Sequence, residues 1–326
     1  MRQLSAWLVL CLLVSGYAFG ESVTPDYTYS SRGQGLFRLG NTGYLVESVH
    51  TYLTNQAYSS IRKNAANLNK AVPAGGAIKK YIYFIESSRS VNLNSDMSGE
   101  NEAYARIKAE HQADGYGTLA LDSPEDYINY FYKSDHHWNY KGSYRGYCDI
   151  VRMILGDSEP LLQPAETVVF PDIPYNGSYN SRLGYYKCDE LFTVYRFEGL
   201  KEYTALINGS PEKKYGYSDT YFRGKYPRIT VFNHYGKFYG GDAGELILKM
   251  NQPDKPNLLI LSNSYSNAVL LLLAQHFNSV HRIDLRFYKQ QMHTSFNIHQ
   301  HIKKHQINIV LEMGDITQFV MTTPLE

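Results

Sequence analysis

The sequence has little of what marks several common protein classes. It contains 3 cysteines and 2 tryptophans among 326 residues. Its 32 basic and 31 acidic residues leave a formal charge of +1, and so balanced a charge argues against a nucleic-acid partner. Beyond the N-terminus no apolar run is long enough to span a membrane, since the strongest, Val269 to Ala274, is too short. The sequence also lacks a dinucleotide fingerprint and a phosphate-binding glycine loop, and we expect no cofactor.

What is present is the composition of an ordinary folded protein. Hydrophobic residues make up 43% of the chain and charged residues 19%, and the length is sufficient for one large domain with a full core. The unusual figure is 30 tyrosines beside 14 phenylalanines. Tyrosine in this excess is typical of core and sheet positions, and it also suits wet surfaces with flat faces, including surfaces that bind sugars.

The first 20 residues have the pattern of a secretory signal peptide. Arg2 provides a positive charge, residues 4–15 are almost wholly apolar, and Ala18-Phe19-Gly20 precedes polar residues. We therefore predict a secreted, periplasmic or cell-envelope protein, with an uncleaved single-pass N-terminal anchor as the alternative. Cleavage would leave two cysteines, Cys148 and Cys188, which either form one disulfide or remain buried thiols.

The rest of the chain predicts a leader over residues 21–42 and a single α/β domain over residues 43–326. Apolar spacing predicts a helix over 44–72, and a dense apolar run predicts a buried strand over 81–85. The further elements expected, in chain order, are helices 101–111, 123–131 and 141–155, strands 190–197, 228–232 and 257–262, helix 265–277, strand 279–285, helix 295–304 and strand 306–312. The last five alternate strand and helix, which is typical of a parallel sheet. Residues 156–228, rich in Tyr and Gly, are interpreted as an insertion that shapes a site.

The run Asp135-His136-His137-Trp138-Asn139 lies in a short polar loop between two predicted helices. A carboxylate two residues before an imidazole can hold the tautomer of that ring and stabilise its protonated form, as in a nucleophilic triad. Two other interpretations of this run remain open. Asp135 or Asn139 could cap the following helix, and Asp135, His136 and His137 could bind a metal ion.

A second polar segment follows the predicted strand 257–262. The chain passes from Leu258-Leu259-Ile260-Leu261 through Ser262-Asn263-Ser264 into an apolar helix. A strand, turn and helix in this order can present a serine hydroxyl at the carboxyl edge of a parallel sheet, where backbone N–H groups can stabilise an oxyanion. The alternative is that the serines of this turn only cap the helix.

The C-terminal region contains a further histidine group. His301 and His305 are one helical turn apart and could share a metal ion, with His299 nearby. Because no acidic residue completes the group, we interpret it as a polar helix face close to Lys303 and Lys304.

The two polar segments together carry a family resemblance. Asp135-His136-His137-Trp138-Asn139-x-x-Gly142 resembles the signature of the DHHW protein family, which is related to the alginate O-acetyltransferase proteins of the AlgX and AlgJ type. Residues 259–268 resemble the serine turn of that family, and residues 281–288 the strand that follows. Ser262 and Asn263 depart from the residues frequent in relatives, which bears on the hydrogen bonds of the turn.

This resemblance implies an SGNH-hydrolase-like three-layer α/β sandwich with a mostly parallel central sheet, in which the Asp-x-His motif precedes the serine. Carried over by position, it makes Ser264 the nucleophile, His137 the general base and then acid, and Asp135 the carboxylate that orients His137. Asn267 and Arg286 are the candidate substrate-binding residues. No metal ion is expected in such a site.

The resemblance implies an extracytoplasmic carbohydrate O-acetyltransferase or acetylesterase that forms an acetyl-serine intermediate. The implied partners are a polysaccharide or cell-envelope glycan and, for transfer, a membrane protein that donates acetyl groups. Two alternatives remain open. One is a catalytically inactive polysaccharide-binding or assembly protein on the same fold, and the other is a secreted metal-dependent hydrolase.

Overall fold

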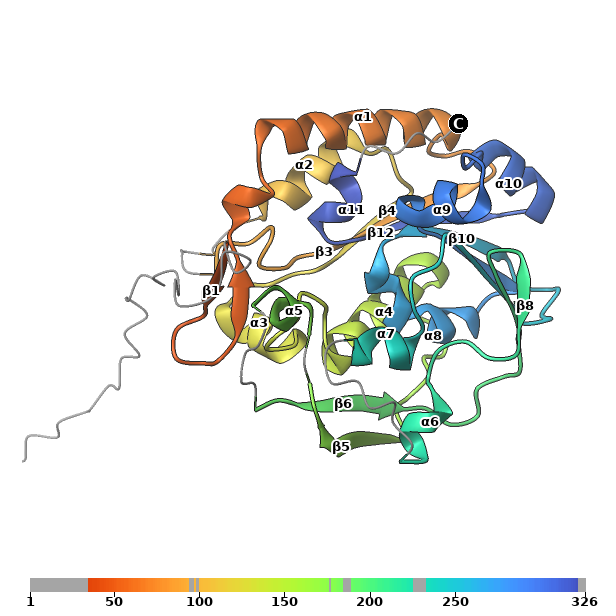
Figure 1. Ribbon diagram of the computed structural model, residues 1–326. Helices are drawn as coiled ribbons and strands as arrows, with labels where there is room; N and C mark the ends of the chain where they lie inside the picture. Colours follow the sequence, from red (N-terminus) through yellow and green to blue (C-terminus); the bar gives the residue numbers. More distant parts are fainter. Residues whose placement is uncertain are drawn as a thin grey trace, which may run out of the picture.

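An eight-stranded sheet runs through the middle of the protein (Figure 1). The computed structural model describes residues 35–93, 97, 100–175, 177–183, 189–224 and 233–321. In spatial order the strands are β4 (Gly115–Leu119), β3 (Lys79–Ile85), β12 (Ile309–Gly314), β10 (Asn257–Ser262), β11 (Ser279–Ile283), β9 (Glu245–Lys249), β7 (Thr204–Ile207) and β8 (Ser210–Glu212). The first five are parallel to one another, and β9, β7 and β8 extend the sheet in antiparallel pairing.

Helices cover both faces of this sheet (Figure 1). One face carries α1 (Asn55–Ala71), α2 (Glu102–Glu110), α9 (Leu285–Met292), α10 (Ile298–His305) and α11 (Ile316–Val320). The opposite face carries α3 (Pro124–Tyr130), α4 (Tyr140–Leu155), α7 (His234–Tyr239) and α8 (Leu270–Ala274). The predicted three-layer α/β sandwich with a mostly parallel sheet is therefore confirmed.

The central strands are apolar because both of their faces are covered. Leu259 and Leu261 of β10 pack into the apolar cluster beneath α1, α2 and α10, whereas Leu258 and Ile260 pack into the cluster on the α4 and α8 face. Side chains alternate between the two faces of a strand, so a strand buried on both faces has a continuous apolar run. This run is the feature that identified β10 and β12 in the sequence.

Two predicted helices differ from the observed elements. The expected helix 44–72 begins as β2 (Leu45–Glu47), which pairs with β1 (Leu36–Arg38), followed by the 3₁₀ turn η2 (Val49–Thr51). Its α-helical part, α1, starts at Asn55 because the hydroxyl of Thr54 accepts a hydrogen bond from the N–H of Ala57. The expected helix 265–277 is divided into the 3₁₀ turn η3 (Ser264–Ala268) and α8.

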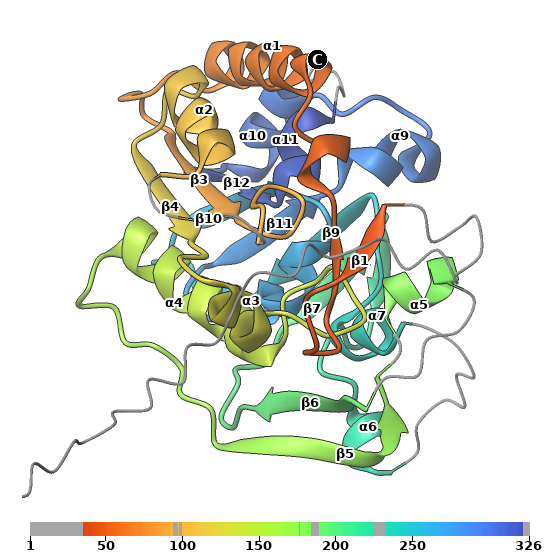
Figure 2. The same cartoon turned by 90° about the vertical axis from the view of Figure 1, so that its left-hand side faces the viewer.

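The insertion contributes both to the sheet and to a separate hairpin. Its β7 and β8 pair at the end of the central sheet, while β5 (Glu166–Pro174) and β6 (Leu191–Arg196) form an antiparallel ribbon below the α3 and α4 layer (Figure 2). The helices α5 (Ser178–Leu183) and α6 (Asp219–Phe222) belong to the same stretch. Aromatic side chains fill the space between this ribbon and the helices α6 and α7, among them Phe192, Tyr221 and Phe238. Many of the tyrosines are buried, as expected for core and sheet residues.

Several expectations concern residues outside the described part of the chain. They are the signal peptide over residues 1–20, most of the leader, the strand 228–232, and Cys188 as a partner for the buried Cys148. These expectations stay predictions. Within the described ranges, every helix is too short or too polar to cross a bilayer.

Candidate active site

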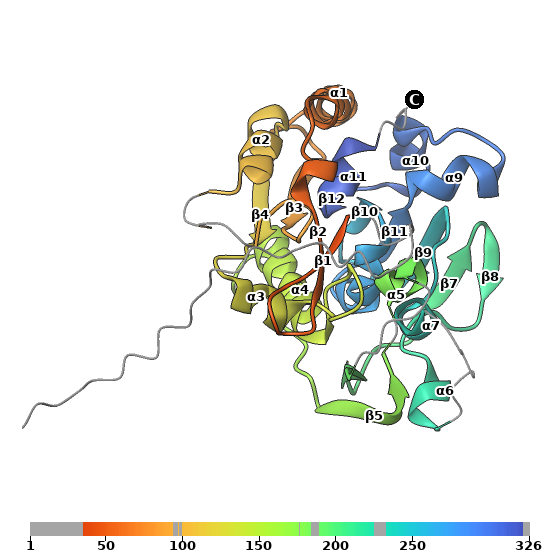
Figure 3. The ribbon, with the colours of Figure 1, turned by 60° about the vertical axis from the view of Figure 1, so that its left-hand side comes forward.

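Three neighbouring parallel strands end at the same edge of the sheet and supply the centre of the site. Arg89 lies in the loop after β3, Asp315 follows β12, and Ser264 follows β10. Ligand sites of parallel α/β sheets lie at the carboxyl ends of the strands. The ribbon of β1 and β2 and the short helix α5 lie in front of this edge (Figure 3).

The serine turn is held by hydrogen bonds from its own residues. The side-chain oxygen of Asn263 accepts from the N–H of Tyr265 at 3.3 Å and so caps η3. The hydroxyl of Ser262 donates to Ser266 at 2.6 Å, and Ser266 donates to the carbonyl of Asn263 at 3.1 Å. Ser262 and Asn263, which depart from the residues frequent in the family, therefore both take part in hydrogen bonds of the turn, with Ser264 at its start.

The polar loop that precedes α4 carries the predicted acid and base. Asn139 caps α4 by accepting from the N–H groups of Lys141 and Gly142, so the capping role belongs to Asn139 and not to Asp135. The N–H of Tyr132 bonds to the carbonyl of His137, which closes the loop at its base. Asp135, His136 and His137 lie in the bend between these contacts.

The three predicted catalytic side chains form one hydrogen-bonded chain. The Nδ1 atom of His137 lies 2.9 Å from Oδ1 of Asp135, and Nε2 lies 2.8 Å from the Oγ atom of Ser264. Because the carboxylate accepts a hydrogen bond from the N–H at Nδ1, we assign Nε2 as the acceptor of the Ser264 hydroxyl. All three residues are buried. The two motifs, 127 positions apart in the chain, therefore meet with triad geometry, and their catalytic roles stay predictions.

The carboxylate of Asp135 is held ionised by its neighbours. Burial alone would raise its pKa, but the adjacent imidazoles of His137 and His136 and the hydrogen bonds that it accepts lower the pKa well below the usual range. The hydroxyl of Tyr175 donates to it at 2.9 Å, and the N–H and hydroxyl of Ser178 donate at 3.2 Å and 3.0 Å. With so many donors, this carboxylate is suited to orient an imidazole and to stabilise its protonated form.

Residues of the insertion approach this carboxylate closely. A Cβ atom at Gly177 would lie 2.3 Å from the Cβ of Asp135, so only glycine fits at that position. Tyr175, Gly177 and Ser178 were not singled out as site residues. In the sequence they stand out only as part of the Tyr- and Gly-rich insertion that was interpreted as shaping a site, with no individual role assigned to them.

Tyr235 is a further site residue that the sequence did not indicate. Its ring stacks on the imidazole of His137 with a centroid distance of 4.1 Å and an interplanar angle of 11°. Its hydroxyl donates to the carbonyl of Ser264 at 3.1 Å. Tyr235 therefore contacts both the predicted base and the predicted nucleophile. No motif surrounds it, and it lies at the start of α7 immediately after residues that are not described.

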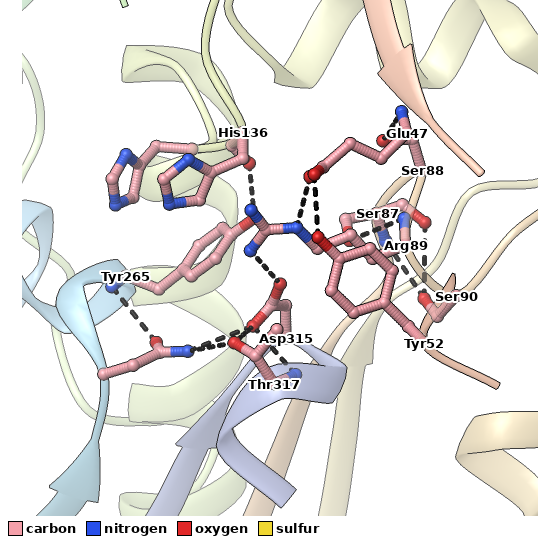
Figure 4. Close-up of polar contacts among 12 residues, drawn as sticks. Glu47, Tyr52, Ser87, Ser88, Arg89, Ser90, His136, Tyr265, Asp315 and Thr317 are labelled. Carbon is pink, nitrogen blue, oxygen red and sulfur yellow. Dashed lines mark hydrogen bonds and ion pairs between the residues drawn. The ribbon is translucent and has the colours of Figure 1, made fainter. Parts of the chain in front are cut away.

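A buried network of charges stands behind the serine turn (Figure 4). Arg89 lies between two carboxylates, with Nε 2.5 Å from Glu47 and Nη1 3.0 Å from Asp315. Asp315 in turn accepts from the amide of Asn263 at 3.0 Å. On the other side of the turn, the hydroxyl of Tyr265 donates to the carbonyl of His136. These contacts connect the ends of three strands to the serine turn and to the loop of the base.

A cavity of about 370 Å³ opens beside the triad. Its wall includes Asp135, His137 and Tyr235, and Arg89 and Arg182 bring two guanidinium groups to it. Both arginines are paired with Glu47. The cavity gives a substrate access to the predicted base.

The candidate substrate-binding residues lie in a separate group of polar contacts. Arg286 is paired with Asp284, with Nη2 2.6 Å from Oδ2, and it reaches Asp242 at 3.5 Å. Asn267 donates to the same Asp242 at 3.1 Å. Neither residue lines the cavity described above, and their role in binding substrate stays a prediction.

Asp135, His136 and His137 also satisfy the spacing of a metal site, because one ligand atom from each lies within 4.8 Å of the others. Both ring nitrogens of His137 already have partners, however, in Asp135 and Ser264. A metal ion bound to His137 would replace one of these two hydrogen bonds. The arrangement of these side chains therefore favours proton transfer over metal binding.

Similar folds occur among solved structures. A DHHW family protein from Eubacterium siraeum has a TM-score of 0.64 and 17% identity, covering 90% of this chain and 93% of that chain. PatB1 from Bacillus cereus, in a structure with a sulfonyl adduct, has a TM-score of 0.65 and 17% identity, covering 88% and 97%. The O-acetyltransferase domain of Pseudomonas putida AlgJ has a TM-score of 0.46 and 13% identity, covering 89% and 94%.

No protein-family model matches the chain, and no curated protein matches its sequence. The similarity is therefore one of fold. At that level the predicted resemblance to the DHHW family and its relatives is confirmed.

Proposed function

We propose that this protein transfers an acetyl group through Ser264, as a carbohydrate O-acetyltransferase or acetylesterase. One observation carries the proposal, namely the hydrogen-bonded chain from Ser264 through His137 to Asp135, with distances of 2.8 Å and 2.9 Å. A hydroxyl, an imidazole and an ionised carboxylate in this order are the groups that nucleophilic acyl transfer uses.

In the first half of the reaction, Oγ of Ser264 attacks the carbonyl carbon of an acetyl ester while Nε2 of His137 accepts the hydroxyl proton. The negative charge develops on the carbonyl oxygen, where the backbone N–H of Ser264, at the start of η3, is the candidate donor. The tetrahedral intermediate then expels the alcohol oxygen, which takes the proton from His137. The products of this half are acetyl-Ser264 and the free alcohol of the donor.

In the second half, a hydroxyl group enters from the cavity and attacks the acetyl carbon while His137 accepts its proton. Collapse of the second intermediate breaks the bond to Oγ, and His137 returns the proton to Ser264. A sugar hydroxyl as acceptor gives transfer, and water gives hydrolysis. The two outcomes use the same protein groups and differ in what the cavity admits.

The choice of a carbohydrate substrate rests on the resemblance of the two motifs to the DHHW and alginate O-acetyltransferase proteins. The extracytoplasmic location rests on the signal-peptide pattern of the first 20 residues. The PatB1 structure with a sulfonyl adduct adds a practical point. Sulfonyl reagents react with activated nucleophiles, so a sulfonyl fluoride is a suitable probe for Ser264.

The test is the turnover of 4-nitrophenyl acetate by the chain that follows residue 20, together with intact-mass analysis after treatment with phenylmethanesulfonyl fluoride. We expect one sulfonyl adduct, mapped to Ser264, and a fall in turnover of about 10³-fold or more for Ser264→Ala and His137→Gln. Ser59→Ala is the matched control, because Ser59 is an exposed serine on α1. It should keep both turnover and labelling.

Two results would overturn the assignment. Full turnover by Ser264→Ala would exclude a Ser264 intermediate. An inert and unlabelled wild-type chain that still binds glycans would indicate the non-catalytic binding protein. Supplying a polysaccharide to the active enzyme and measuring acetate release against acetyl incorporation then separates the esterase from the transferase.

A further inference from the structure

A second group of histidines lies away from the triad, on the elements α10 and β11. His281 belongs to β11, and His301 and His305 belong to α10. His281 is level with Leu259 in the neighbouring strand. That position is five residues before Ser264, or roughly 16 Å away along the strand. The group is therefore independent of the proposed reaction at Ser264.

The sequence interpretation of this region was wrong in one respect. It treated His299, His301 and His305 as a polar helix face, but His301 is buried and only His299 of the three is exposed. His281, which lies on a separate strand, takes the place of His299 in the group. Contacts between a strand and a later helix do not appear in the spacing of either segment.

The distances among the three imidazoles are close to those of a metal site. The Nδ1 atom of His281 lies 3.1 Å from Nε2 of His301, and a ligand nitrogen of His305 lies within 4.8 Å of both. Two nitrogens bound to one zinc ion at about 2.0–2.1 Å in a tetrahedron are roughly 3.3 Å apart. The first pair therefore already has this spacing. His305, half-buried at the end of α10, would bring its nitrogen closer than the present limit of 4.8 Å to complete the set.

The outer nitrogens of the first pair face oxygen atoms. The hydroxyl of Ser279 donates to Asn257 at 2.9 Å, so its oxygen accepts from Nε2 of His281 at 3.0 Å. The Nδ1 atom of His301 faces the carboxylate of Glu245 at 3.9 Å. The contact with Ser279 is a hydrogen bond of the kind that orients ligand histidines in metal proteins, whereas the contact with Glu245 is longer than a hydrogen bond and acts through charge.

The outer partners influence which ring nitrogens carry a proton, and therefore what kind of contact the two inner nitrogens make. With protons on the outer nitrogens, Nδ1 of His281 and Nε2 of His301 direct two lone pairs at each other across 3.1 Å. Two facing lone pairs repel unless a cation lies between them. A proton on Nε2 of His301 would relieve the repulsion, but it would turn the lone pair of Nδ1 toward the carboxylate of Glu245.

The group is also accessible. A surface cavity of about 870 Å³ is lined by His281 and His305, together with Lys249 and Lys304. Both lysines are exposed, so their amino groups remain in solvent, whereas Glu245 is buried beside the ligands. An ion can reach the histidines from this cavity, and a water molecule or a small ligand can complete its coordination.

We propose that His281, His301 and His305 bind one divalent transition-metal ion, with zinc as the reference ion, and leave a coordination position open to the cavity. Imidazole nitrogen is a ligand that suits zinc, copper and nickel. Because the ligands come from β11 and α10, the bound ion would tie these two elements together and stabilise the fold. It would take no part in the step at Ser264.

The test uses the untagged chain after treatment with a chelator and dialysis. Titration calorimetry with zinc chloride should give one site per chain, and cobalt chloride should give the visible absorption of a tetrahedral ion. We expect zinc to raise the unfolding temperature, as any ligand of the native state does. His305→Gln, at a half-buried position that should fold normally, should weaken zinc binding by about 100-fold.

His299→Gln is the matched control on the same helix, and it should change the affinity by less than about threefold because His299 lies outside the group. Zinc binding that is unchanged in His305→Gln would overturn the proposal. The absence of binding by the wild-type chain at about 0.1 mM zinc would also overturn it. Loss of binding in His136→Gln, with retention in His305→Gln, would instead place the ion beside Asp135. The proposal at Ser264 is judged separately by turnover in the presence of chelator.

Discussion

We propose different chemistry for the two histidine groups of this protein, although both use the same side chain. At the carboxyl edge of the sheet, His137 has a carboxylate at one ring nitrogen and a hydroxyl at the other. Between β11 and α10, His281 and His301 have oxygen atoms at their outer nitrogens and face each other with their inner ones. The partners of the two nitrogens thus distinguish the proposed proton-transfer group from the proposed metal ligands.

The two regions also differ in how they are built. The triad comes from loops that follow strands or precede a helix, held by a buried network of charges around Arg89. The second group comes from the interior of a strand and from one face of a helix. Loops at the strand ends leave a cavity beside Asp135 and His137, whereas the strand and helix bring three rings into direct contact.

The largest expected effect comes from changing the carboxylate that distinguishes His137 from the other histidines. Asp135→Asn keeps the size of the side chain but replaces an acceptor by a donor at Nδ1, which favours the wrong tautomer of His137. We expect acetyl-ester turnover to fall by about 10³- to 10⁴-fold. Zinc binding at His281 should not change. A variant with more than a tenth of wild-type turnover would contradict the triad assignment.

A smaller effect is expected at Asn263, which connects the charge network to the serine turn. Asn263→Ala removes the contact with Asp315 at 3.0 Å and the cap on Tyr265. Because this contact positions Ser264 without touching substrate, kcat should fall by about 10- to 100-fold while KM changes little. Steady-state kinetics with 4-nitrophenyl acetate measures both constants. An increase in KM alone would indicate that Asn263 contacts the substrate.

We expect acid to lower the unfolding free energy of the wild type more than that of Asp135→Asn. The pKa of Asp135 lies below its ordinary value of 3.8 because the imidazoles and hydrogen bonds around it outweigh the effect of burial. A carboxylate with a depressed pKa stabilises the fold above its unfolded pKa, and this contribution is lost as the pH falls. Between about pH 4 and pH 2, the unfolding free energy of the wild type should therefore fall more steeply, by up to about 1.4 kcal/mol per pH unit.

Urea unfolding at several pH values measures this difference. The stability advantage of the wild type over Asp135→Asn should be largest near neutral pH and should shrink toward pH 2. Parallel curves for the two chains would show that Asp135 is not held ionised by its neighbours.

The smallest expected effect sharpens the comparison at the second group. Glu245→Gln keeps the size of the side chain facing Nδ1 of His301 but removes its charge. Zinc affinity should fall by about tenfold, which is within the range for an outer partner of a ligand histidine. Turnover at Ser264 should be unchanged. Calorimetry on the wild type and Glu245→Gln measures the ratio of their zinc dissociation constants. An increase in affinity in the variant would show that Glu245 does not support His301 as a ligand.

The sequence indicated the parts of the site that are local in the chain. Asp135 and His137 stand two residues apart, and Ser264 follows directly on an apolar strand, so each motif is visible within a few residues. The parallel strands β3, β10, β11 and β12 were visible for the same reason, since burial on both faces requires a continuous apolar run. The fifth parallel strand, β4, was missed because it has no such run and is only half-buried. These features predict the fold class and the proposed pairing of Ser264 with His137.

The remaining features arise from contacts between distant segments. Glu47, Arg89 and Asp315 meet because β2, β3 and β12 end at one edge of the molecule, and Tyr235 reaches His137 from a helix about a hundred positions later in the chain. No local spacing encodes such contacts. The antiparallel extension of the sheet by β9, β7 and β8 was unpredicted for the same reason.

The sequence by itself determined an α/β chain with a carboxylate, an imidazole and a serine in positions where a parallel sheet could unite them. Only the tertiary structure decided that they lie 2.9 Å and 2.8 Å apart, and that His281 joins His301 and His305. The physical reason is the distance along the chain over which each effect acts. Apolar periodicity and capping act over a few residues, whereas the geometry of a site is set by how whole strands and helices pack.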